Sequence, residues 1–132
     1  MTSPAKMTEL KTLSTLLKVM AEPKRLEILS LLLEGTHCNC EMGEKLSMAP
    51  NLLSHHLRVL YEAGLIETER DEVDARWIYY SIKLEALEDL LAQLQGFLDI
   101  SKVPVRRPDC GPGNKSFTPL RDRSCKSCNE KE

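Results

Sequence analysis

One stretch, from Leu46 to Ile82, limits the possible folds of this chain more than any other, because its apolar residues change periodicity partway along. In the first half they recur every three or four positions, which is the repeat of a helix with one buried face. These residues are Ala49, Leu53, Leu57 and Leu60. After Gly64, residues 65–70 and 76–82 have the alternation and composition of strands, and an acidic turn at 71–75 separates them. The stretch therefore predicts a helix that leads directly into a β-hairpin.

The predicted helix has well-marked ends and a polar outer face. Ser47 can cap its start, Pro50 suits its first turn, and Gly64 can end it in a left-handed conformation. The side chains opposite the apolar stripe are short, polar and able to form hydrogen bonds. They are Asn51, Ser54, His55, Arg58 and Glu62. A polar-faced helix followed by a two-stranded ribbon predicts a winged helix with DNA as its target.

Leucine-rich stripes predict the other helices. They indicate helices at 7–20, 22–33 and 84–100, and a short helix at 41–46 that forms a helix-turn-helix with the polar-faced helix. Residues 36–40 are expected to be a connector. The predicted fold class is therefore mostly α with a small β-hairpin, a winged helix-turn-helix.

The domain boundaries follow from changes in composition. We expect a folded domain over 7–100, a flexible N-terminus at 1–6, and a flexible, basic, cysteine-containing tail at 101–132. The first and last helices of the domain would expose apolar surface in a monomer, so we expect them to form a homodimer interface. The alternative is that both pack only on their own domain.

Composition excludes several classes of function. A net charge of −2 argues against a generally basic coat, so contacts to DNA must come from locally placed groups. No apolar run is long enough to span a membrane, and no targeting segment is recognisable, so a cytoplasmic protein without a membrane partner is expected. The sequence contains no catalytic constellation or phosphate-binding loop, which predicts a non-enzyme without a small-molecule substrate or required cofactor. Five cysteines without disulfide-scaffold spacing indicate reduced thiols or metal ligands.

From about Leu10 to Leu98 the chain resembles the ArsR/SmtB family of bacterial metalloregulatory repressors. The resemblance rests on LLKVMAEPKRLEILSLLLEG, on the CNC element, on SMAPNLLSHHLRVLYEAGLIETERDEVDARWIYYSI, and on the helix that follows. It implies a homodimeric winged helix that binds operator DNA and releases it when an inducer binds.

Carried onto this sequence, the resemblance also implies which residues contact DNA, from the polar-faced helix and from the wing. They are Asn51, Ser54, His55, Arg58, Arg70 and Arg76. Asparagine can bond adenine, and arginine can bond guanine or phosphate, which agrees with this assignment. His56 lies on the inward side of the helix and is interpreted as a packed structural histidine. Trp77, Tyr79 and Tyr80 are interpreted as sheet and core packing.

Cys38 and Cys40 occupy the position where members of the family place a Cys-x-Cys pair. Two thiolates one residue apart can chelate a soft ion if the backbone there is not regular helix. Soft-ligand chemistry favours arsenite or antimonite as the inducer, then cadmium or lead, with zinc less favoured. The alternative is that the two thiols are incidental small apolar side chains.

The sequence departs from the arsenic-responsive pattern, which often has a third cysteine where this chain has Gly43. The third ligand must then come from the tail, whose thiols are Cys110, Cys125 and Cys128. Cys110 ranks first because it is nearest the domain, whereas the Cys125 and Cys128 pair could complete the site, bind separately or do nothing. His37 could ligate zinc, although a solvent-facing loop position is the commoner case. The zinc-type site of the last helix is not expected, since residues 84–100 lack histidine.

Three alternatives remain open. A thiol redox or persulfide sensor on the same fold would use oxidation of Cys38 or Cys40. A small thiol oxidoreductase would use the CKSC segment of the tail, but no strand-to-helix context surrounds it. In a plain dimerisation or DNA-architectural protein, neither the Cys38 and Cys40 pair nor the CKSC segment would have a role.

Overall fold

The computed structural model describes residues 3–105. One compact unit extends to Leu98 and a second begins at Asp99. The elements in chain order are α1 (Pro4–Met20), α2 (Pro23–Leu32), β1 (His37–Cys38), α3 (Asn39–Leu46), α4 (Pro50–Glu62), β2 (Ile66–Arg70), β3 (Ile78–Ile82), α5 (Leu84–Phe97) and the 3-10 helix η1 (Ile100–Lys102). Among the described residues, η1 is the only element of the second unit, where the carboxylate of Asp99 accepts a hydrogen bond from the Ser101 N–H at 3.0 Å.

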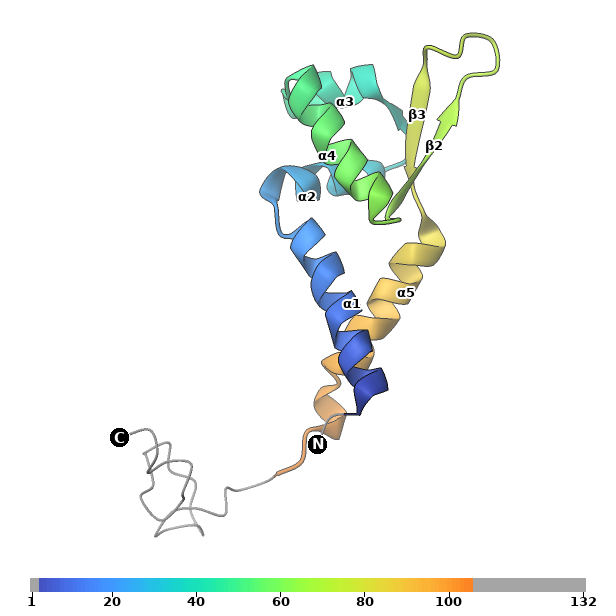
Figure 1. Cartoon of the computed structure of the whole chain (residues 1–132). Helices are drawn as coiled ribbons and strands as arrows, with labels where there is room; N and C mark the ends of the chain where they lie inside the picture. Colours follow the sequence, from blue (N-terminus) through green and yellow to red (C-terminus); the bar gives the residue numbers. More distant parts are fainter. Residues whose placement is uncertain (1–2, 106–132) are drawn as a thin grey trace. The chain divides into compact units, whose positions relative to one another are not determined.

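The first unit has one apolar core, to which every helix contributes. Its fully buried side chains come from α2, α3, α4, β2 and α5. They are Ile28, Met42, Leu60, Ile66 and Leu90. Figure 1 shows α2, α3 and α4 gathered beside the strands, while α1 and α5 extend away from them. None of the helices within residues 3–105 has both the length and the apolar character needed to cross a membrane.

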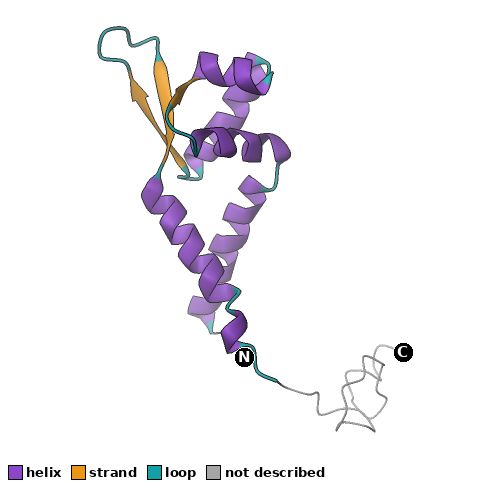
Figure 2. Cartoon of the chain, turned by 180° about the vertical axis from the view of Figure 1, so that it is seen from behind, coloured by secondary structure: helices purple, strands orange, loops and turns teal. Residues whose placement is uncertain are grey.

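The three strands form an antiparallel sheet in the order β1-β3-β2 (Figure 2, orange). The hairpin of β2 and β3 is the predicted wing, and its register pairs Ile66 with Ile82 and Arg70 with Ile78. The additional strand β1 was predicted to be a connector, and that prediction is wrong. Two residues are too few to show an alternating pattern, and the strand exists because it pairs with β3 across the fold.

The turn between α3 and α4 differs from the prediction at Ser47. This residue does not cap α4. It ends α3 in a left-handed conformation with φ of 49°, and the N-cap of α4 is Ala49. The turn lets the chain reverse so that Met48 is buried and its N–H donates to the Gly43 carbonyl at 3.1 Å. The prediction for Gly64 is confirmed, because it follows α4 with φ of 79°.

Three helix ends also differ from the predicted ones. Helix α1 begins at Pro4, inside the segment expected to be flexible, because Ser3 accepts a hydrogen bond from the Lys6 N–H at 3.2 Å and Pro4 suits a first helical position. Helix α3 begins at Asn39, two residues earlier than predicted, and α5 ends at Phe97 instead of near residue 100.

Candidate DNA-binding surface and thiol site

Helix α4 has one buried face and one free face. Its buried residues are Leu53, His56, Leu57 and Leu60. The predicted DNA-contacting residues of this helix are all exposed, and they are Asn51, Ser54, His55 and Arg58. The helix is therefore oriented so that a continuous polar surface, able to form hydrogen bonds, is available to a ligand.

His56 is a structural histidine, as predicted. It is 6% exposed, and its Nδ1 accepts a hydrogen bond from Nε of Arg25 at 3.2 Å. Burial lowers the pKa of His56, and the charge of Arg25 lowers it further. Arg25 also donates to the Val19 carbonyl at 3.0 Å, so this one side chain joins the end of α1 and the start of α2 to α4. No periodicity in the sequence predicts the Arg25–His56 pair.

The tip of the wing holds both predicted arginines. Arg70 donates to the Ala75 carbonyl at 2.7 Å, and Arg76 forms a bidentate ion pair with Asp74, the shorter contact being 2.7 Å. Both side chains are exposed and both are positioned by atoms of the turn itself. The wing therefore presents two fixed cations beside its acidic groups.

The aromatic residues of the wing agree only partly with the prediction. Tyr79 and Tyr80 are half-buried in the sheet, and Tyr80 packs against the core. Trp77 was expected to pack in the same way, but it is 45% exposed. It precedes β3 and lies in the turn, where the core does not reach.

Cys38 and Cys40 lie at the N-terminus of α3, the first helix of the helix-turn-helix. Cys38 is the N-cap residue and is 5% exposed, whereas Cys40 is exposed in the first turn. The thiol of Cys38 donates to Oε1 of Glu41 at 3.2 Å, and the Cys38 backbone N–H donates to the same oxygen at 3.4 Å. These hydrogen bonds lower the pKa of Glu41. The two thiols are free.

His37, beside this pair, is not the solvent-facing residue that was expected. It is 7% exposed, its Nδ1 lies 2.8 Å from the Gly35 carbonyl, and its Nε2 lies 3.3 Å from Nζ of Lys45. Because a lysine ammonium can only donate, Nε2 accepts and Nδ1 carries the proton. Both ring nitrogens are engaged in the fold.

The described residues do not complete a metal site by themselves. Within residues 3–105 no group of three histidine, cysteine or acidic side chains is placed to hold a metal ion. The three predicted tail ligands, Cys110, Cys125 and Cys128, lie outside the described residues. The structure thus offers two soft donors at one helix end.

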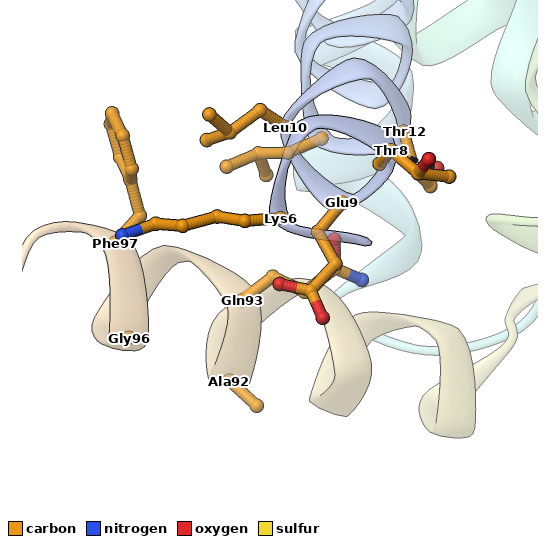
Figure 3. Close-up of a pocket in the computed structure, with 10 residues that line it drawn as sticks. Lys6, Thr8, Glu9, Leu10, Thr12, Ala92, Gln93, Gly96 and Phe97 are labelled. Atoms are coloured by element: carbon orange, nitrogen blue, oxygen red, sulfur yellow. Dashed lines mark hydrogen bonds between the residues drawn. The ribbon is translucent and has the colours of Figure 1, made fainter. Parts of the chain in front are cut away.

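Helices α1 and α5 enclose an open, largely apolar groove of about 630 Å³. Figure 3 shows Lys6 and Glu9 of α1, and Gln93 and Phe97 of α5, among the residues that line it. Around it the two helices and the residue after α5 expose several large apolar side chains. They are Met7, Leu17, Leu91, Phe97 and Leu98.

Comparison with known proteins places this fold in a family. Residues 22–68 match the family described as bacterial regulatory protein, arsR family. The chain is 36% identical to an arsenical resistance operon repressor of Staphylococcus aureus over 84 residues, which covers 64% of this chain and 78% of that protein.

Solved structures with a similar fold agree with this family assignment. NolR from Sinorhizobium fredii superimposes with a TM-score of 0.58 and 32% identity, covering 73% of this chain and 93% of that one. A homodimeric winged helix-turn-helix DNA-binding domain from Mycobacterium bovis gives a TM-score of 0.58 and 29% identity, covering 74% and 87%. The winged helix-turn-helix and the non-enzyme class predicted from the sequence are both confirmed by these relatives. The chain belongs to the ArsR family of bacterial regulatory proteins, which are DNA-binding transcriptional regulators.

Proposed function

We propose that this protein is a repressor that binds operator DNA as a homodimer and releases it when a soft thiophilic ion binds Cys38 and Cys40 together with a tail thiol. Arsenite or antimonite is the first choice of ion, and cadmium or lead is the second. The observation that supports this proposal most directly is the position of the two thiols. Cys38 caps the N-terminus of α3 and Cys40 lies in its first turn, and α3 leads through a single tight turn into the exposed polar helix α4.

The donors suit a soft ion, but the present geometry does not gather them. The Cys38 thiol is buried and bonded to Glu41, while Cys40 is exposed. Cys38 is the N-cap residue with an extended backbone, and even in a regular helix two residues two positions apart are separated by about 200° around the axis. One ion can therefore bind both thiols only if Cys38 leaves Glu41 and the first turn of α3 rearranges.

That rearrangement gives the ion a way to act on DNA binding. Met42 of α3 and Met48 of the following turn are both buried in the core that holds α4. A change in the first turn of α3 is therefore transmitted to the helix that would read the operator. An ion that binds the rearranged state better shifts the population away from the DNA-competent one.

The homodimer is supported by the exposed apolar surface of α1 and α5 and by the homodimeric relative from Mycobacterium bovis. We expect Leu91→Glu to weaken dimerisation at least a hundredfold, since a charge buried in an apolar interface loses its hydration. Leu91 is 52% exposed, so the monomer should still fold. Light scattering over a concentration series measures the effect. Leu33→Glu is the matched control, since Leu33 is exposed but lies outside both helices, and a dimer that persists in the Leu91 variant contradicts the proposed interface.

Base reading by α4 is tested by Arg58→Ala. Loss of one bidentate arginine contact should lower operator affinity by about 1–3 kcal/mol, or roughly tenfold to a hundredfold. Fluorescence anisotropy with a labelled duplex measures this change. Glu62→Ala, on the exposed side of the same helix, is the control and should not reduce affinity. Equal losses from both substitutions would mean that the face of α4 is not read specifically.

The function itself is tested with the native, reduced, full-length protein. A random duplex library is selected for binding, and the enriched duplex is then titrated with arsenite, antimonite, cadmium, lead and zinc. We expect a specific sequence to be enriched and to be released by arsenite before zinc. Failure to enrich any duplex, or a complex that none of these ions releases, contradicts the proposal.

A thiol redox or persulfide sensor is the second candidate, because exposed Cys40 is accessible to an oxidant. Peroxide and polysulfide arms in the same titration separate the two functions. Release by polysulfide under conditions in which arsenite has no effect would favour the sensor.

A further inference from the structure

We infer that Tyr79 is the positioning residue through which the state of the Cys38 thiol reaches the tip of the wing. This inference rests on the proposed function, because it takes Cys38 as a ligand for the inducing ion. It adds a second route from the thiols to DNA, separate from the turn between α3 and α4.

The first step is the position of Tyr79 in the sheet. It lies in the central strand β3, opposite Cys38 on β1 and opposite Glu69 on β2. Residues directly opposite each other on antiparallel strands have side chains on the same face, with Cβ atoms about 5 Å apart. The side chains of Tyr79 and Cys38 therefore leave neighbouring strands side by side on one face of the sheet. The pKa of Tyr79 agrees with this position: a hydrogen bond to Asp71 raises it most, burial raises it further, and the nearby acidic groups Asp71 and Glu41 add to the effect.

The second step is the other end of the same side chain. The Tyr79 hydroxyl donates to Oδ2 of Asp71 at 2.6 Å. The other carboxylate oxygen of Asp71 accepts from the N–H groups of Val73 at 2.8 Å and Asp74 at 3.0 Å. Asp71 therefore orders the turn, and the hydroxyl of Tyr79 holds Asp71 in place. Hydrogen bonds to an ionised carboxylate are stronger than those between neutral groups.

The third step connects the turn to the wing cation. Asp74, whose N–H is held by Asp71, carries the bidentate ion pair with Arg76. A continuous series of contacts thus leads from Cys38 through Tyr79, Asp71 and Asp74 to Arg76. When an ion draws the Cys38 thiol away from Glu41, the adjoining ring must repack, the bond to Asp71 is lost, and the turn no longer fixes Arg76.

The chain contains a built-in probe for this movement. Trp77 is its single tryptophan, and it lies in the turn. Its carbonyl accepts from the Asp71 N–H at 2.9 Å, and its own N–H donates to the Asp74 carbonyl at 3.0 Å. Because the side chain is partly exposed, its emission responds to the order of the turn.

The experiment titrates the reduced full-length protein with arsenite and records two signals at once. Absorption by the arsenic–thiolate bonds measures binding, and Trp77 emission measures the wing. In the native protein we expect both signals to change with the same midpoint. In Tyr79→Phe we expect binding within threefold of native but an emission change at least fivefold smaller. Tyr80→Phe is the matched control, because Tyr80 is the next residue on the opposite face, and it should behave as native.

Each outcome separates this inference from the function it rests on. If Tyr79→Phe binds arsenite and its emission changes as much as in the native protein, the inference is overturned and the thiol site stands. If the native protein shows no thiolate absorption, the proposed function fails, and the inference fails with it. Asp71→Asn weakens the same hydrogen bond from the other side, because it replaces a charged acceptor with a neutral amide, and it serves in place of Tyr79→Phe should that variant not fold. A smaller emission change in either variant, with binding retained, supports the inference.

Discussion

Replacing Cys38 and Cys40 together by serine should give a repressor that stays on its operator when arsenite is added. Serine is a good N-cap residue and retains a hydrogen-bond donor for Glu41, so α3 should form and operator affinity without arsenite should remain within about threefold of native. The native protein should lose affinity by about 5-fold to 150-fold on binding the ion, which is the usual range of coupling between two sites. In the double variant this ratio should fall to about one. Anisotropy of a labelled operator, with and without arsenite, measures it.

The tail thiols provide the controls for this prediction. Cys110→Ser, Cys125→Ser and Cys128→Ser leave the first turn of α3 intact, and the variant that weakens thiolate absorption identifies the third ligand. We expect Cys110→Ser to have the largest effect of the three. A Cys38 and Cys40 double variant that arsenite still releases from DNA would show that the pair is not the inducer site.

Truncating Leu60 to alanine should destabilise the protein by about 2–5 kcal/mol, because it leaves a cavity where the side chain was fully buried in the core. Leu60 is on the inner face of α4 and shares the core with residues of α2, β2 and α5. Chemical denaturation at one fixed protein concentration measures the loss, since the stability of a dimer depends on concentration.

The control for Leu60 lies on the same helix. Leu52 is 42% exposed, so Leu52→Ala should change the free energy of unfolding by no more than about 0.5 kcal/mol. Similar losses at both positions would mean that the two faces of α4 are assigned incorrectly. The comparison therefore checks the orientation on which the DNA-binding proposal depends.

Elements with a long periodic pattern could be predicted from the sequence. The three leucine-rich helices, the polar-faced helix and the wing hairpin agree in type with α1, α2, α5, α4 and the β2–β3 hairpin of the structure. The inward position of His56 follows from its place beside Leu53 and Leu57. Such predictions succeed because burial of one face repeats at a fixed spacing, and several residues report the same orientation.

Features that depend on single long-range contacts could not be predicted in this way. Strand β1 exists only through its pairing with β3, and His37 is buried because that strand places it against the fold. Ser47 carries the signal of a helix N-cap, yet it ends α3 in a left-handed conformation, and Met48 after it is buried in the core. The Tyr79–Asp71 bond joins residues eight positions apart through the shape of the turn.

The shortness of β1 has a consequence for how fast such a regulator can respond. Only two residues pair it with β3, so few backbone hydrogen bonds hold the strand, and we expect it to open locally at a lower free energy than global unfolding requires. If Cys38 is a ligand as proposed, the buried thiol becomes accessible each time this strand detaches. The inducing ion then captures a conformation that the protein already visits, and the opening frequency of one short strand sets an upper limit on the rate of induction.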